Sequence, residues 1–241
     1  MEKNALITGA AKRIGKNIAN HLATKGWNIA IHYNHSKKEA EELQHKLKTK
    51  YPLQKFVCVQ ANLEVSTEVD TLLARANDLM GSISLLANNA SVFDASIIDK
   101  TSHQLFTRNM QINFAAPFFL IQHFALQTEY GCVINTVDTR ITTNQNSHAA
   151  YTISKKALWE LTKMAALEYS PKIRVNAIAP GVTIPPPGGS EDELWEMASR
   201  IPMQKPSGIA PILKSIDFII ENTHLTGQLL FCDGGENIGK R

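Results

Sequence analysis

Residues 5–15 read ALITGAAKRIG, a short apolar run, a turn with two glycines and the beginning of a helical pattern. Apolar residues continue at helical spacing through Ile18 and Leu22. A strand that passes through a glycine turn into a helix presents backbone N–H groups to a phosphate, so this segment is a candidate pyrophosphate site. Gly9 would permit the tight turn, and Gly15 the close packing of helix and strand. Alternatively, both glycines serve only the conformation of the turn.

Short apolar segments alternate with longer helical patterns along the whole chain. The expected strands lie at residues 5–7, 28–32, 56–60, 84–87, 132–136, 174–179 and 229–232. The first of them are nearly continuous apolar runs, as expected of a parallel sheet that helices cover on both faces. The sequence contains no internal repeat and no linker. We therefore predict one α/β domain over residues 1–241, a Rossmann-type doubly wound parallel sheet of about seven strands with helices on both faces.

One segment interrupts this alternation. Residues 184–190 read IPPPGGS, where three prolines cannot donate backbone hydrogen bonds and two glycines remove stiffness. Ser190 and the acidic residues after it are typical of a helix N-terminus, and this short helix is expected to run through Arg200. We predict that residues 184–206 form an insertion that covers a substrate.

The composition argues against several classes of protein. Of the 241 residues, 44% are hydrophobic and 20% are charged, which is ordinary for a globular domain. The net charge of +3 comes from scattered cations, so no nucleic-acid partner is expected. No apolar run could cross a bilayer and no signal-peptide pattern begins the chain, so we predict a cytoplasmic protein with no membrane partner. Cys58, Cys132 and Cys232 lie too far apart for a disulfide framework or a metal site, and we expect buried thiols and no metal.

The segment after the second expected strand bears on the choice of cofactor. An NAD site places an acidic residue about 20 residues beyond the glycine turn, where it binds the ribose 2′-OH. Residues 32–36 read HYNHS, and no carboxylate follows until Glu39. Arg13, His35 and Ser36 could instead donate to a 2′-phosphate, so NADPH (or NADP) is the predicted cofactor. Alternatively, Arg13 is a solvent-facing helix residue.

Tyr151 and Lys155 form the candidate catalytic pair. Residues 151–155 read YTISK and open an apolar helical pattern, which places both side chains on one helical face. An ammonium in this position favours phenolate and lowers the pKa of the tyrosine, which makes the phenol usable as an acid or base near neutral pH. A tyrosine and a lysine at this spacing also occur by chance in many helices, so the pair alone does not indicate a catalytic site.

Several segments, in a fixed order over essentially the whole chain, carry a family resemblance. They are residues 8–15, Asn88-Asn89-Ala90, Asn113, Tyr151 with Lys155, Pro180-Gly181 and Asp233-Gly234-Gly235. This set resembles the short-chain dehydrogenase/reductase family. The resemblance implies that Tyr151 exchanges a proton with the substrate, that Lys155 holds the nicotinamide ribose and that Asn113 supports a proton-relay water. It also implies a cofactor site formed by Gly9, Arg13, Ile14, Gly15, His32, Tyr33, Asn34, His35, Ser36, Asn62, Leu63, Asn89, Ala90, Ser91, Tyr151, Lys155, Pro180, Gly181, Val182 and Thr183.

One position departs from the pattern of the family. Most members carry a serine shortly before the tyrosine, at the position of Asp138 in this chain. An ionised carboxylate only accepts hydrogen bonds, so it cannot donate to a ketone oxygen but can bind an amidine-like N–H edge. Together with Arg13, Asp138 resembles the pteridine reductases and the related dihydromonapterin and dihydrofolate reductases. That likeness implies a substrate site of Ser91, Phe93, Asp138 and Tyr151, in which Phe93 stacks on the pterin ring; alternatively, Phe93 is a core residue.

The reaction predicted from this resemblance is the NADPH-dependent reduction of a C=N bond in a pterin or folate-like substrate. Hydride would reach a ring carbon, and the proton would come from Tyr151 or from a water ordered by Asp138. The implied catalytic set is Asp138, Tyr151, Lys155 and Asn113. Two alternatives stay open, a carbonyl reductase such as a 3-oxoacyl-carrier-protein reductase, and a non-catalytic NADPH sensor. The resemblance also implies a homodimer or homotetramer, built partly from helices around residues 105–127 and 151–169.

Overall fold

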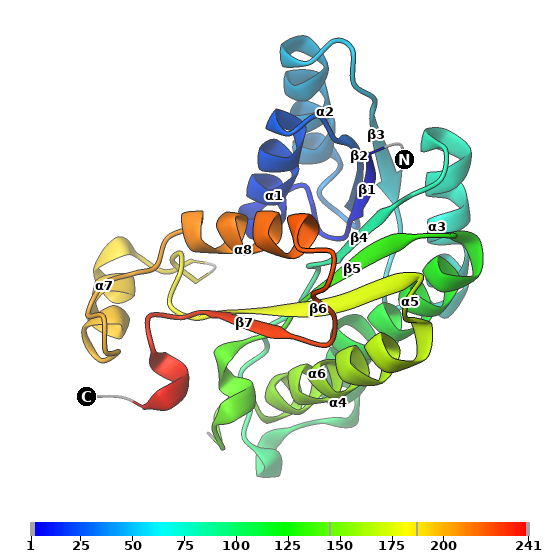
Figure 1. Ribbon diagram of the computed structural model, residues 1–241. Coiled ribbons are helices and arrows are strands. Elements are labelled where there is room, and N and C mark those ends of the chain that lie inside the picture. The colour runs from blue at the N-terminus through cyan, green and yellow to red at the C-terminus, as the bar shows by residue number, and fades with distance from the viewer. Residues whose placement is uncertain (1–2, 145, 187, 240–241) are drawn as a thin grey trace.

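The computed structural model describes residues 3–144, 146–186 and 188–239. Seven parallel strands form one sheet in the order β3-β2-β1-β4-β5-β6-β7 (Figure 1). The strands are β1 (Asn4–Ile7), β2 (Asn28–Tyr33), β3 (Phe56–Gln60), β4 (Leu85–Asn88), β5 (Gly131–Thr136), β6 (Ile173–Pro180) and β7 (Leu229–Cys232). The predicted Rossmann-type α/β fold is confirmed, and each strand begins and ends within one residue of its expected bounds.

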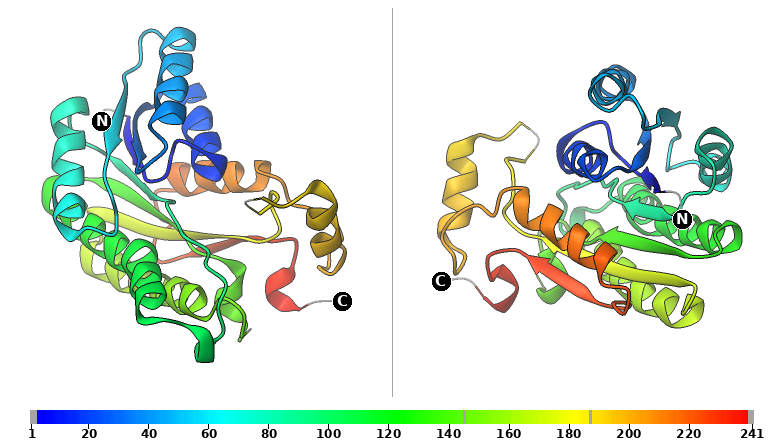
Figure 2. Two further views of the ribbon diagram at one scale, coloured as in Figure 1. Left: turned by 180° about the vertical axis from the view of Figure 1, so that it is seen from behind. Right: turned by 45° about the horizontal axis from the view of Figure 1, so that its top comes forward.

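Helices cover both faces of the sheet (Figures 1 and 2). One face carries α1 (Arg13–Thr24), α2 (Lys37–Lys50) and α8 (Ala210–Glu221). The other carries α3 (Ser66–Met80), α4 (His103–Met110), α5 (Ala116–Gln127) and α6 (Ala149–Tyr169). Because successive side chains of a strand point to opposite faces, the sheet contributes to two separate apolar cores. Leu6 of β1 packs in the core with α3 and α5, and its neighbour Ile7 packs in the core with α1 and α8.

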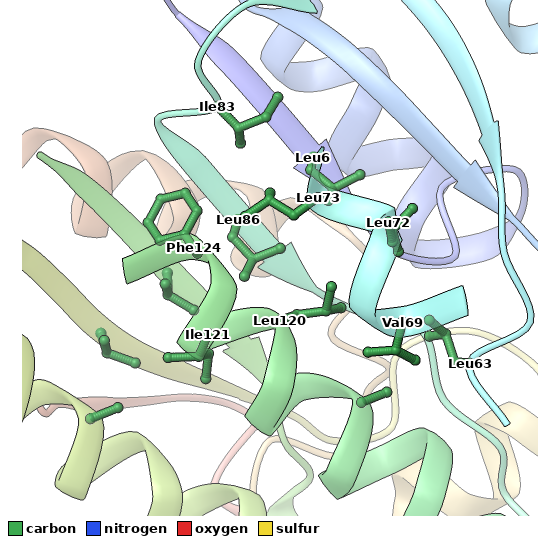
Figure 3. Packing of buried hydrophobic residues seen from close by; sticks show 14 of the residues in the cluster. Leu6, Leu63, Val69, Leu72, Leu73, Ile83, Leu86, Leu120, Ile121 and Phe124 are labelled. Atoms are coloured by element: carbon green, nitrogen blue, oxygen red, sulfur yellow. The ribbon is translucent and has the colours of Figure 1, made fainter. Parts of the chain in front are cut away.

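The apolar core between α3, α5 and the sheet holds α5 in place. Figure 3 shows Leu72 and Leu73 of α3 gathered with Leu120 and Phe124 of α5. Leu72, Leu73, Leu120 and Phe124 are all fully buried. Burial of a Leu or Phe side chain stabilises the fold by about 1.5–3 kcal/mol, so this core holds α5 firmly on the sheet.

The helices expected around residues 105–127 are joined by an irregular segment. A π-helical segment, η2 (Gln111–Ala115), separates α4 from α5. Such segments change the direction in which side chains leave a helix and are frequent at functional sites. Here the segment carries Asn113, which is fully buried. The helical segment of residues 103–127 is therefore divided into two α-helices by η2.

The carboxyl ends of the strands form the functional end of the sheet. The order of the strands reverses between β1 and β4, and ligands of such sheets bind outside the strand ends at this switch point. The helix α7 (Glu191–Ser199) and the short helix η4 (Glu236–Ile238) lie side by side beyond the ends of β6 and β7 (Figures 1 and 2). Met203 N donates to Gly234 O over 3.1 Å, which links the segment after α7 to the one before η4.

The insertion predicted at residues 184–206 therefore lies at this end of the sheet, although its residue Pro187 is outside the described part of the chain. The predicted start of α7 is confirmed, because Ser190 and Glu193 form a reciprocal capping box.

The structure also bears on the burial of the cysteines, on membrane-spanning helices and on metal sites. Cys132 and Cys232 are buried as expected, whereas Cys58 is only partly buried. Within residues 3–144, 146–186 and 188–239, no helix is long and apolar enough to cross a membrane. The same residues contain no group of three or more His, Cys, Asp or Glu side chains that could hold a metal ion.

Candidate active site

A cavity of about 730 Å³ opens at the carboxyl end of the sheet, between the glycine turn and α7. Many of the predicted site residues line it, namely Gly9, Arg13, Ile14, Gly15, Asn89, Ala90, Ser91, Phe93, Asp138, Tyr151, Lys155, Pro180, Gly181, Val182 and Thr183. They come from the loops after β1, β4, β5 and β6, from the first turn of α1 and from α6. The parallel sheet therefore brings together residues that are far apart in the sequence.

The glycine turn is fixed by hydrogen bonds between β1 and β4. Thr8 Oγ1 accepts from Asn89 N (2.9 Å) and Ala90 N (3.0 Å), and Asn89 Nδ2 donates to Thr8 O (3.0 Å). Gly9 has a φ of +64°, and a Cβ on Gly15 would collide with the carbonyl oxygen of Gly9. The N-terminus of α1 carries no side-chain cap. Its first N–H groups can therefore receive a pyrophosphate, so the turn fits a dinucleotide.

The buried side chain of His32 forms a hydrogen bond with the glycine turn. Its Nδ1 accepts from Gly9 N (3.0 Å), so its Nε2 carries the proton and donates to Ala61 O (3.0 Å). Burial lowers the pKa of His32 to about 4, and the imidazole is neutral. Both ring nitrogens are thus engaged within the protein. The structure places His32 behind the turn, not at a surface where it could contact a cofactor, which corrects the direct role implied for it.

The residues predicted near a 2′-phosphate follow β2. His35 is exposed, and Ser36 precedes α2 without capping it by its side chain. Asn34 Nδ2 donates to Asn62 Oδ1 over 3.2 Å, which joins the ends of β2 and β3. Arg13 has a left-handed φ of +51° and donates from Nη2 to Pro185 O over 2.7 Å. Its guanidinium is therefore directed across the cavity to the loop after β6, contrary to the expectation that it joins His35 and Ser36.

Tyr151, Asp138 and Lys155 meet at the inner end of the cavity. Tyr151 Oη donates to Asp138 Oδ2 over 2.6 Å, and Arg140 N donates to Asp138 Oδ1 over 2.8 Å. Lys155 Nζ donates to Thr136 O over 2.8 Å and lies 5.9 Å from the centre of the Tyr151 ring. Tyr151 and Lys155 are both buried. The phenol of Tyr151 and the carboxylate of Asp138 thus form a hydrogen-bonded pair.

The pKa values of this group differ from expectation. Burial, followed by the charge and hydrogen bond of Asp138, raises the pKa of Tyr151 well above its usual range. Burial also lowers the pKa of Lys155 to about 8, against the opposing effect of Asp138. The prediction that Lys155 lowers the pKa of Tyr151 is therefore wrong for this structure, because the carboxylate stabilises the protonated phenol. Tyr151 holds its proton and can act as a general acid.

Phe93 stands at the side of this group. Its ring stacks on that of His148 (centroids 4.0 Å apart, planes at 14°) and meets the ring of Tyr151 edge-on at 4.6 Å. The guanidinium of Arg140 lies over the Phe93 ring, 5.2 Å from its centre. Phe93 lines the cavity and is 43% exposed. It is therefore not a core residue, although His148 and Arg140 both pack against its ring.

Asn113 holds the loop that carries Phe93. Its Oδ1 accepts from Ser91 Oγ and Val92 N, both over 3.0 Å. Its Nδ2 donates to Val92 O and to Ser154 Oγ, both over 3.1 Å. Asn113, which lies in η2, thus links the loop after β4 to α6. It affects the site by holding Ser91 in position.

Arg140, His148 and Arg108 were not predicted from the sequence. Arg140 follows Asp138 by two residues and His148 precedes Tyr151 by three, so closeness to the predicted pair was the available signal. Arg108 gave no such signal, since only the fold brings α4 to the cavity.

Comparisons with known proteins agree with this geometry. The family model described as short chain dehydrogenase matches residues 3–192. The chain is 30% identical to the 3-oxoacyl-[acyl-carrier-protein] reductase FabG of Staphylococcus epidermidis, over 98% of this chain and 99% of that protein. It is also 30% identical to pteridine reductase 1 of Leishmania tarentolae, over 97% and 96% of the two chains. The structure of FolM alternative dihydrofolate reductase 1 from Brucella canis, complexed with NADP, superposes with a TM-score of 0.91 at 33% identity, covering 98% of this chain and 94% of that one.

Proposed function

This chain belongs to the short-chain dehydrogenase family and is an NADP-dependent oxidoreductase, and from this premise we propose that it reduces a C=N bond of a dihydropterin-type ring. The observation that carries the proposal is the hydrogen bond of 2.6 Å from Tyr151 Oη to Asp138 Oδ2. A carboxylate stands where most members of the family have a serine hydroxyl. A carboxylate can accept from the N–H groups of an amino-pyrimidine edge, which a ketone lacks.

The chain's own residues would hold the cofactor along the cavity. The N-terminus of α1 and the turn at Gly9 would receive the pyrophosphate, and Lys155 would bind the nicotinamide ribose. Residues 180–183 would border the nicotinamide. Asn62, with Asn34, would meet the adenosine end. When bound, NADPH supplies the hydride.

Proton transfer would be the task of Tyr151 and Asp138. Reduction of C=N adds a hydride to the ring carbon and a proton to the adjacent nitrogen. Tyr151 keeps its proton because its pKa is raised. It can donate that proton directly, or Asp138 can order a water that does so. Phe93, with its cavity-lining ring, would stack on the heteroaromatic ring, which adds about 0.5–1.5 kcal/mol beyond area burial.

The second candidate is a carbonyl reductase of the type of 3-oxoacyl-carrier-protein reductase. It is favoured by the identity of 30% to the Staphylococcus epidermidis enzyme, equal to the identity to the pteridine reductase. Asp138 argues against it, since an ionised carboxylate cannot donate to a ketone oxygen. A non-catalytic sensor of NADPH would have no need of a buried acid paired to a carboxylate.

The substitution Asp138→Ser tests the proposal. We expect it to lower NADPH oxidation with a dihydropterin by about 100-fold, the range of one general acid–base group, while the dissociation constant of NADPH stays within about twofold. Asp78→Ser, at an exposed position on α3, is the matched control and should change neither quantity. Unchanged turnover in Asp138→Ser would refute the role of the carboxylate.

The quaternary structure is a further part of the proposal. Phe118 and Phe119 on α5, and Ile153, Met164 and Leu167 on α6, are large apolar side chains that are between 39% and 86% exposed. An apolar surface on two adjacent helices is typical of an interface between subunits. We therefore propose a homodimer or homotetramer that buries this surface, and light scattering should give a mass at least twice that of the chain. A monomeric mass would contradict it.

A further inference from the structure

Arg108 on α4 joins two parts of the site that are far apart in the sequence. Its Nη1 donates to Asp94 Oδ2 over 2.8 Å, and its Nε donates to Glu64 Oε1 over 3.2 Å. Asp94 directly follows Phe93. Glu64 follows the segment Asn62-Leu63 at the end of β3. One planar guanidinium therefore spans from the adenosine end of the proposed cofactor site to the aromatic wall of the substrate site.

The Asp94 side of this bridge is held firmly. Asn109 is fully buried and donates from Nδ2 to Asp94 Oδ2 over 3.1 Å. Asn113 donates to Asn109 Oδ1 over 3.4 Å and fixes Val92 as described above. The side chains of Arg108, Asn109 and Asn113 thus set the position of residues 91–94. A displacement of this part of α4 and η2 would displace Phe93 as well.

The Glu64 side is tied to the loop after β3. Glu64 N donates to Asn62 Oδ1 over 3.0 Å, the same oxygen that accepts from Asn34. A ligand that orders Asn62 would therefore order Glu64. The side chains of Arg108, Glu64 and Asp94 are 40%, 41% and 30% exposed. Ion pairs at that exposure are weak, so they are suited to shifting a loop equilibrium by a small factor and contribute little to the stability of the fold.

We propose that Arg108 is a positioning residue that transmits binding at the adenosine end of the cofactor site to the loop carrying Phe93. The substrate wall would then be ordered when the cofactor is bound. The inference rests on the placement of adenosine against Asn62 in the proposed function, but it does not depend on the identity of the acceptor. The coupling should amount to roughly two- to fivefold, because the ion pairs that carry it are partly exposed.

Hydrogen exchange with adenosine 2′,5′-bisphosphate tests this coupling, since this probe is the adenosine half of NADP and has no nicotinamide to touch Phe93. In the parent protein, we expect the probe to slow exchange at residues 60–64 and also, by roughly two- to fivefold, at residues 92–98. In Arg108→Gln and in Glu64→Gln, the slowing at residues 60–64 should persist and the slowing at residues 92–98 should be lost. Arg108→Lys, which keeps the charge, should restore part of it.

Arg75→Gln is the matched control. Arg75 Nη1 donates to Gln60 O over 2.9 Å, so it touches the same end of β3. We expect Arg75→Gln to keep the slowing at residues 92–98. With any acceptor that the parent reduces, Arg108→Gln should raise the KM of the acceptor roughly two- to fivefold and leave kcat within about twofold, because Tyr151 and Lys155 are not touched.

Three results would overturn the inference. If the slowing at residues 92–98 were equal in the parent and in Arg108→Gln, the coupling would not depend on Arg108. Slowing confined to residues 60–64 in the parent would show that the two ends are not coupled. No slowing at residues 60–64 would remove the placement of adenosine against Asn62, and the coupling with it. In all three cases, reduction of a pterin can still be assayed separately, so a failure of the coupling can be distinguished from a failure of the proposed reaction.

Discussion

Lys155→Met should stabilise the protein at neutral pH while it removes the group proposed to bind the cofactor ribose. Lys155 is buried, and its pKa falls from 10.5 to about 8. A difference of about 2.5 in pKa corresponds to about 3 kcal/mol of unfavourable burial of the ammonium. Methionine fills a similar volume without charge. It loses the hydrogen bond to Thr136 O, which leaves an acceptor unsatisfied at a cost of about 1–2 kcal/mol. The net gain should be about 1–2 kcal/mol.

The pH dependence of this gain has a defined sign. Below pH 8, Lys155 is protonated in both the folded and the unfolded chain, and the parent bears the full cost of the buried charge. Between pH 8 and about 10.5 the folded state releases the proton while the unfolded state retains it. The unfolded state then binds more protons, so the parent gains stability as the pH rises. The advantage of Lys155→Met should therefore be complete below pH 8 and disappear between pH 8 and 10.5. Above that range the variant should be less stable than the parent by about 1–2 kcal/mol, because only the lost hydrogen bond to Thr136 O still counts.

Urea unfolding of the parent and of Lys155→Met at a series of pH values measures both effects. Lys163→Met is the matched control, since Lys163 lies on the same helix, is 44% exposed and pairs with Glu160. It should change the free energy of unfolding by less than about 1 kcal/mol at every pH. If Lys155→Met were less stable than the parent at pH 7, with a gap independent of pH, the reasoning about the buried ammonium would be refuted.

Two further substitutions test the glycine turn and the insertion. Gly15→Ala places a Cβ against the carbonyl oxygen of Gly9 and the amide of Asn89, so NADPH affinity measured by fluorescence titration should fall at least about tenfold; unchanged affinity would contradict the assigned packing. Ser190→Ala removes the capping box of α7, a loss of about 1 kcal/mol, and should raise the KM of the acceptor while that of NADPH stays constant. An equal rise in both constants would argue against a role of α7 in covering the substrate.

The fold could be predicted from the sequence because most strands are short, largely apolar runs between longer helical patterns. Buried parallel strands require such runs, and the seven of them fixed the sheet and its strand ends closely. The apolar runs do not by themselves give the order of the strands in the sheet, which follows from the general pattern of doubly wound folds. The π-helical segment at Gln111–Ala115 could not be predicted, because its apolar residues keep a helical period and the extra turn shows only in the backbone.

The sequence names candidate residues for the site but gives no information on the hydrogen bonds between them. Tyr151 and Asp138 carry chemistry that can be named from the sequence, yet their hydrogen bond depends on how the loop after β5 returns toward α6. The sequence therefore suggested that Lys155 controls the pKa of Tyr151, whereas Asp138 is the closer charge. His32 shows the same limit, since a histidine at the end of a strand gives no sign that both its nitrogens are engaged beneath a turn.

The central claim is that a carboxylate beside the phenol commits this reductase to a pterin-type C=N bond. Its most direct test is NADPH oxidation by the unmodified protein with dihydrobiopterin, dihydromonapterin and dihydrofolate, measured against an acetoacetyl thioester. We expect kcat/KM for at least one of the three pterin or folate substrates to exceed that for the thioester by about 100-fold or more. Faster turnover of the thioester than of all three would contradict the claim and assign the chain to carbonyl reduction.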